Sequence, residues 1–214
     1  LAWTTSIKSS QPLTGFSHGA AGMSLALLEL AKVSGEPRFL DDALRAMEYE
    51  RGEFDPILGN WPDFRDIGDT GGVKHMVTWC HGAPGIGLAR LRSLAHVNDQ
   101  RIRDEIIAAI RITVEKGFGH SHCLCHGDLG NMELLLEASN VVPDPRLRAD
   151  LNRFVSRVFA SIKQFGWVCG IPDGLETPGL MTGLAGIGYG LLRLAEPGIV
   201  PSVLTLSPPM SRFK

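Results

Sequence analysis

Several features that mark common classes of protein are weak or missing in this sequence. Lys and Arg number 21 against 23 Asp and Glu, and no long run carries charge of one sign, so the electrostatic pattern of a nucleic-acid-binding or membrane-surface protein is lacking. The longest apolar stretches are far shorter than the roughly 20 residues of a membrane-spanning helix, and the first residues do not resemble a signal peptide. We therefore expect a cytoplasmic protein with no nucleic-acid partner and no membrane-spanning segment.

Evidence for β-strands and for a disulfide framework is also weak. Strand patterns are faint throughout the sequence. Only 4 cysteines occur in 214 residues, and two of them stand next to histidine; this usage fits metal ligation in a reducing compartment better than disulfides. The hydrophobic content of 44% supplies one sizeable core, and no linker-like tract divides the chain, so residues 1–214 are predicted to form one unit.

The sequence does contain a repeated pattern in which two glycines, three positions apart, open an apolar run of low charge. The copies are residues 18–22 (HGAAG), 81–85 (HGAPG), 126–130 (HGDLG) and 182–186 (TGLAG). The apolar runs that follow favour helices buried on most sides. The stretches between them are amphipathic and favour helices with one solvent-exposed face; they are residues 37–51, 100–116 and 145–165. This alternation predicts an all-α fold of stacked αα-hairpins, with inner helices around a centre and outer helices facing water.

Two segments interrupt the helical rhythm. Residues 52–78 are rich in glycine, proline and asparagine and are predicted to form a long loop, and residues 166–178 a shorter one. Loops of this length inside a compact domain are uncommon unless they cover a site. We expect both to lie over the mouth of a central cavity.

Cysteine and histidine stand directly ahead of two of the inner helices. Cys80 precedes one, and Cys125 and His126 precede another. If the repeats are arranged radially, these equivalent helix N-termini converge, and their partial positive charge favours thiolates. Three such ligands with a vacant fourth position are typical of a catalytic zinc site. Two thiolates temper the Lewis acidity of Zn²⁺, which suits it to holding a third thiol as a nucleophile.

The other cysteines have simpler interpretations. Cys169 is expected to be a small buried apolar side chain. Cys123 is either a bystander or a fourth ligand, which would close the metal site and make it structural.

The roles of the other histidines in the repeats and loops are not decided by the sequence. His120 and His122 lie in a polar loop and are expected to be solvated. His81 follows a candidate ligand and has a supporting or proton-transfer role at most. His18 is either a core histidine or, from its position in the repeat, a residue that faces the same cavity.

The stretches 15–19 (GFSHG), 79–85 (WCHGAPG), 124–128 (LCHGD) and 179–186 (GLMTGLAG) resemble the lanthionine synthetase C-like cyclase family. Residues 201–209 (PSVLTLSPP) are similar to the end of class II bifunctional lanthipeptide synthetases, whose C-terminal domain is this cyclase. The resemblance covers nearly the whole chain. It implies an α/α toroid, a zinc ion held by Cys80, Cys125 and His126, and a catalytic histidine at His18.

The reaction that this resemblance implies is the addition of a cysteine thiol to dehydroalanine or dehydrobutyrine within one dehydrated precursor peptide, which closes a thioether ring. Only four of the expected inner helices are present, so residues 1–214 are expected to be the C-terminal part of a cyclase domain and an incomplete ring. The N-terminal dehydratase and cyclase portions of the same enzyme would then be its partners.

Three other functions remain possible on the residues alone. In a non-enzymatic module the zinc would only crosslink loops. A protein related to the cyclases would bind thiols such as glutathione without closing rings. A carbohydrate enzyme on the same fold would need paired carboxylates, for which the loops offer Asp63, Asp66, Asp69, Asp128 and Asp173.

Overall fold

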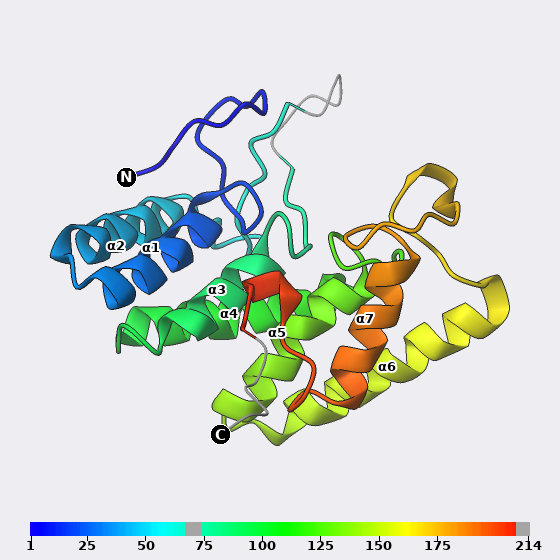
Figure 1. The fold of residues 1–214 in the computed structure, drawn as a ribbon. Helices are drawn as coiled ribbons and strands as arrows, with labels where there is room; N and C mark the ends of the chain where they lie inside the picture. The colour runs from blue at the N-terminus through cyan, green and yellow to red at the C-terminus, as the bar shows by residue number, and fades with distance from the viewer. Residues whose placement is uncertain (67–73, 209–214) are drawn as a thin grey trace. The chain divides into compact units, whose positions relative to one another are not determined.

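The structure is a computed structural model, and it describes residues 1–66 and 74–208. Within these ranges the chain forms seven α-helices and two short 3₁₀ helices, with isolated β-bridges and no strand (Figure 1). The α-helices are α1 (Ala20–Ser34), α2 (Pro37–Gly52), α3 (Ala83–Ser93), α4 (Gln100–Lys116), α5 (Asp128–Val141), α6 (Pro145–Phe165) and α7 (Leu184–Ala195), and the 3₁₀ helices are η1 (Pro172–Gly174) and η2 (Val203–Thr205). The predicted all-α class is confirmed.

The described chain divides into two compact units, residues 1–116 and 117–214. In the first unit α1 packs on α2, α3 packs on α4, and α1 also contacts α3. In the second unit α5 packs on α6 and contacts α7. Each of the first three repeats is therefore an inner helix packed on the outer helix that follows it, as the sequence predicts. The assignment of residues 1–214 to one domain stays a prediction.

The inner helix α3 and the outer helix α4 differ in burial as their composition predicts. On α3, Ile86, Leu88 and Ala89 have no exposed surface, and Arg90 beside them is equally buried. The outer helix α4 buries only one face, on which Ile102 and Ile106 lie four positions apart, the spacing that brings side chains to the same side of a helix. The low-charge helices α3 and α5 are thus buried on most sides, as predicted, whereas the expectation is wrong for α1 and α7, which each bury only one face.

The described parts of the long loop between α2 and α3 contain no helix, as predicted. They are held by isolated bridges that pair Asp55 with Asn60, Asp63 with Lys74, and Val77 with Gly82. Trp61, in the middle of this loop, is 1% exposed, so the loop packs into the first unit as a structured segment. Residues 67–73, which include Asp69, lie outside the described residues.

Among the described residues, none of the helices is both long enough and apolar enough to cross a bilayer.

Candidate functional site

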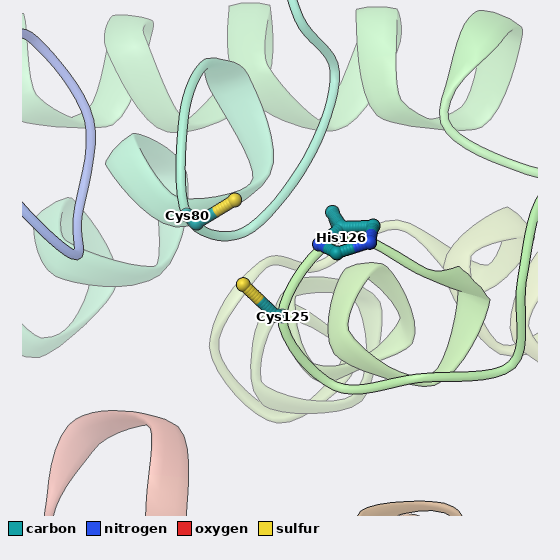
Figure 2. Close-up of side chains that lie close together, drawn as sticks. All are labelled: Cys80, Cys125 and His126. Atoms are coloured by element: carbon teal, nitrogen blue, oxygen red, sulfur yellow. The ribbon is translucent and has the colours of Figure 1, made fainter. Parts of the chain in front are cut away.

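Figure 2 shows Cys80 in the loop that leads into α3, and Cys125 and His126 in the loop that leads into α5. Cys80 belongs to the first unit, whereas Cys125 and His126 belong to the second. Each candidate ligand therefore lies directly ahead of an inner helix, in the place that the repeat predicts. Cys80 is 7% exposed, and Cys125 and His126 are both half-buried.

In the first unit, the loop that carries His18 is hydrogen-bonded to Cys80. The backbone N–H groups of Phe16 and Ser17 both donate to the carbonyl oxygen of Cys80, each at 3.2 Å. His18 follows immediately and its side chain is exposed, so the alternative of a core histidine is wrong. The backbone thus holds an accessible imidazole beside the residue that offers the first sulfur.

The buried ring of His81 packs against the ring of His18. The two imidazole rings are stacked with centroids 5.9 Å apart, and His81 is only 2% exposed. Its Nδ1 lies 3.8 Å from Oδ1 of the buried Asp63. Burial holds the pKa of His81 below its ordinary value, against the opposing negative charges of Cys80 and Asp63. A supporting role for His81, as the sequence suggested, agrees with this position.

Asp63 is in turn fixed by Arg65. The guanidinium donates to both carboxylate oxygens, with Nη2 2.6 Å from Oδ2. Burial acts to raise the pKa of Asp63, but the hydrogen bonds from Arg65 outweigh it and hold that pKa below its ordinary value. Asp63 is therefore an ionised group that faces His81 from inside the loop.

In the second unit, a carbonyl group sets the tautomer of His126. Its Nε2 lies 2.9 Å from the carbonyl oxygen of Gly170, which can only accept, so Nε2 carries the proton and donates. In the neutral ring Nδ1 is then the unprotonated nitrogen, the form that binds a metal. Metal-binding histidines commonly donate their other ring N–H to a backbone carbonyl in this way, so the local geometry of His126 fits a metal ligand.

Glycine is required at position 170 for this contact. A Cβ atom there would lie 2.8 Å from Nε2 of His126 and 2.4 Å from Sγ of Cys123. These distances are too short for carbon against nitrogen or sulfur. The absence of a side chain allows the 170 backbone to approach both residues.

Cys123 is fully buried and accepts hydrogen bonds from its own loop. The hydroxyl of Ser121 donates to its sulfur at 3.3 Å, and the backbone N–H of His126 at 3.5 Å. Burial acts to raise the pKa of the Cys123 thiol, but hydrogen bonds from the side chain of His126, from Ser121 and from the backbone of His126 outweigh it and lower that pKa. These hydrogen bonds tie Cys123 to the loop that carries His126. Cys169 is 1% exposed, which confirms the interpretation of a buried apolar side chain.

The expectation that His120 and His122 are both solvated is wrong for His122. His120 is exposed, but His122 has no exposed surface. Its Nδ1 accepts the N–H of Val168 at 3.1 Å, and its Nε2 lies 2.9 Å from Oγ of Ser161. Residues some forty positions away supply both partners, so the polar neighbours in the sequence gave no sign of this burial.

The carboxylates that a carbohydrate enzyme would need have other partners. Asp63 is bound by Arg65, Asp66 forms an ion pair with Lys8, and Asp128 accepts the backbone N–H groups of residues 119 and 120. Asp173 is exposed in the 3₁₀ helix η1, and Asp69 lies outside the described residues. No observation on the described carboxylates therefore supports a paired-carboxylate site.

Comparisons with known proteins agree with these observations. The family model described as "Lanthionine synthetase C-like protein" matches residues 3–205. The chain is 27% identical over 200 residues to the lacticin 481/lactococcin biosynthesis protein LcnDR2 of Lactococcus lactis subsp. lactis, covering 87% of this chain and 21% of that protein. It is 25% identical over 197 residues to the glutathione S-transferase LANCL1 of Danio rerio, covering 86% of this chain and 43% of that protein.

Among solved structures, nisin cyclase matches with a TM-score of 0.68 at 18% sequence identity, over 86% of this chain and 47% of that one. This likeness confirms the predicted α/α toroid fold class. The chain spans less than half the length of each of these three proteins.

The burial of His122 predicts a pH dependence of stability. Burial lowers the pKa of the folded His122 below its ordinary value of about 6.5. Below that pH the unfolded chain takes up a proton that the folded chain does not, so the free energy of unfolding falls as the pH falls. We expect His122→Gln to be less stable than the wild type at pH 7.5 and to lose less stability between about pH 6.5 and 5. Urea unfolding at a series of pH values measures this.

The matched control is His120→Gln, which changes an exposed histidine in the same loop. It should keep the pH dependence of the wild type. Parallel curves for His122→Gln and the wild type would show that His122 does not resist protonation.

Proposed function

Since the chain belongs to the lanthionine synthetase C-like family, we propose that it is the C-terminal part of a lanthipeptide cyclase. The enzyme would add a cysteine thiol of a dehydrated precursor peptide to dehydroalanine or dehydrobutyrine in the same peptide, forming lanthionine or methyllanthionine. The relative named for lacticin 481 biosynthesis and the structural likeness to nisin cyclase support this. Its partners would be that peptide and the N-terminal dehydratase and cyclase portions of the same enzyme, in the cytoplasm.

We propose Cys80, Cys125 and His126 as the zinc ligands. Two cysteine sulfurs and one imidazole nitrogen are a donor set that zinc commonly takes, and such a set leaves one of four tetrahedral positions for the substrate. The tautomer of His126 supports its role, because Nε2 donates to the carbonyl oxygen of Gly170. Bound there, zinc would supply a site that stabilises the substrate thiol as a thiolate.

The strongest support for a catalytic role of His18 is the pair of hydrogen bonds from its loop to the Cys80 carbonyl. An exposed imidazole is thereby held beside a proposed metal ligand. When the substrate sulfur bonds to the β-carbon, the electron pair of the carbon–carbon double bond moves onto the α-carbon and its carbonyl group. His18 would either take the proton of the incoming thiol or return a proton to the resulting enolate at the α-carbon.

A second candidate function is the addition of the glutathione thiol to an electrophilic substrate without ring closure, which the similarity to a glutathione S-transferase favours. The two functions differ in their products. Ring closure consumes a free thiol of the peptide without changing its mass, whereas glutathione addition increases the mass and leaves the peptide thiol intact. Incubation with a synthetic peptide that contains one dehydroalanine and one cysteine, in the presence of glutathione, separates them by mass spectrometry.

The ligand assignment and the role of His18 make separable predictions. Cys80→Ser and Cys125→Ser should each lose most of the bound zinc, while Cys169→Ser, a buried cysteine outside the ligand set, should keep it. His18→Asn should retain zinc but slow ring closure by about 10²- to 10⁴-fold, the usual contribution of general acid–base catalysis. Metal analysis and alkylation of the remaining free thiols measure the two effects.

Full zinc occupancy in either of the two ligand variants would refute the ligand assignment. An unchanged rate in His18→Asn would refute the catalytic role of His18 and leave the metal site standing.

The contact between Gly170 and His126 predicts the cost of a single methyl group. Gly170→Ala should displace the 170 carbonyl and weaken zinc binding by about 10- to 100-fold, as loss of a hydrogen-bond partner of a metal ligand commonly does. Competition with a chromogenic zinc chelator measures this affinity. Gly188→Ala is the control, because a Cβ at that position in α7 would meet no atom within 4 Å beyond its chain neighbours and the backbone of its own helix; equal zinc affinities in the two variants would contradict the role of the 170 carbonyl.

A further inference from the structure

A buried ion pair joins two helices of the first unit without an evident gain in stability. Glu50, near the end of α2, and Arg90, on α3, both have no exposed surface, and Nη2 of Arg90 lies 3.0 Å from Oε2 of Glu50. Removing two charges from water costs about as much as their attraction returns, so such a pair is weak evidence of stabilisation. The second oxygen of Glu50 indicates a different role.

Oε1 of Glu50 accepts the backbone N–H of Gly15 at 2.9 Å. The next two N–H groups, of Phe16 and Ser17, donate to the carbonyl oxygen of Cys80. Three successive N–H groups of this loop are therefore held by acceptors from two other segments. The residue that follows them is His18, whose ring is stacked on His81.

The backbone at Gly15 leaves little room for another arrangement. Gly15 has a φ of +96°, and a Cβ atom there would lie 2.8 Å from the Cys80 oxygen and 3.0 Å from Cα of His81. The loop thus crosses the Cys80 segment at close range. A small rotation of the Gly15 peptide plane would move both the hydrogen bonds to Cys80 and the imidazole that follows.

Other charged groups hold the carboxylate of Glu50 in place. Nε of Arg90 is hydrogen-bonded to Glu105 on α4, and Glu105 also binds Arg51. Burial raises the pKa of Glu50, and the charge of Arg90 and the N–H of Gly15 oppose that increase. Because Arg90 is tied to a second carboxylate, it fixes the direction in which Glu50 presents Oε1.

We propose that Glu50 is a positioning residue for His18: its carboxylate, oriented by Arg90, fixes the Gly15 peptide and so sets where the His18 imidazole stands relative to Cys80. This inference rests on the catalytic role proposed for His18. A charge-assisted hydrogen bond to a backbone N–H is stronger than a neutral one, which suits it to holding a loop that carries an exposed side chain.

The test is Glu50→Gln in the zinc-loaded protein. Glutamine has one acceptor oxygen for two donors, so either the Gly15 N–H or Arg90 must face an NH₂ group. A displacement of about 1 Å at a reacting group can lower a rate by roughly 10²-fold. We therefore expect kcat for ring closure of the synthetic dehydroalanine–cysteine peptide to fall by about 10- to 100-fold, with KM and zinc content unchanged.

The matched control is Glu133→Gln in the second unit. Glu133 on α5 is also buried and pairs with Arg193 at 3.1 Å, so the same chemical change removes a charge from an equivalent ion pair distant in sequence from the His18 loop. Its kcat should stay within about threefold of the wild type, a change too small to reflect a lost catalytic contact. Equal losses of kcat in the two variants would overturn the proposal.

Amide hydrogen exchange provides a measurement that needs no activity. Glu50→Gln should speed exchange at Gly15, Phe16 and Ser17, and Glu133→Gln should not. If the wild type closes no rings, the proposed function fails, but exchange still decides whether Glu50 holds the loop. Unchanged exchange at these three amides in Glu50→Gln would overturn the positioning role.

A second variant covers the case in which Glu50→Gln does not fold. In the double variant Glu50→Met and Arg90→Met, two apolar side chains replace the ion pair, a change that is often neutral or stabilising. This protein should fold and bind zinc, yet show the same loss of kcat and the same faster exchange at Gly15. A folded double variant with the kcat of the wild type would overturn the proposal.

Discussion

The carbonyl oxygen of Cys80 is the constraint on which the first unit depends. It accepts two successive N–H groups of the loop before His18, while the sulfur of the same residue is a proposed metal ligand. One residue therefore links the proposed metal ligand and the proposed acid–base residue through its backbone. Around it, His81 supports the His18 ring, Asp63 faces His81, and the close crossing at Gly15 requires a residue without a side chain.

The second unit holds the loop of its proposed ligands in a similar way, with backbone groups among the hydrogen-bond partners. The Gly170 carbonyl fixes the tautomer of His126, and the carboxylate of Asp128, at the start of α5, accepts the N–H groups of Gly119 and His120. His122 ties the same loop to Val168. In both units a loop ahead of an inner helix is held at several points before any metal binds, which reduces the ordering that binding must supply.

Sequence predicted the helices well because their periodic patterns are strong: α4 and α6 begin and end at the predicted residues. The repeat and the paired Cys-His motifs also identified the candidate ligands. The sequence did not reveal the hydrogen bonds made by Glu50 and Gly170 or the burial of His122. Their partners lie 35, 44 and 46 positions away in the chain. Such contacts follow from the packing of helices and loops and leave no local pattern.

We propose that two cysteines and one histidine bind a zinc ion whose fourth position accepts a substrate thiol. X-ray absorption at the zinc edge tests it most directly. We expect two sulfur ligands at about 2.3 Å and one imidazole nitrogen in the resting protein, and a third sulfur when a cysteine-containing peptide is added. A ligand set unchanged by the peptide, or a resting site with four protein ligands, would contradict it.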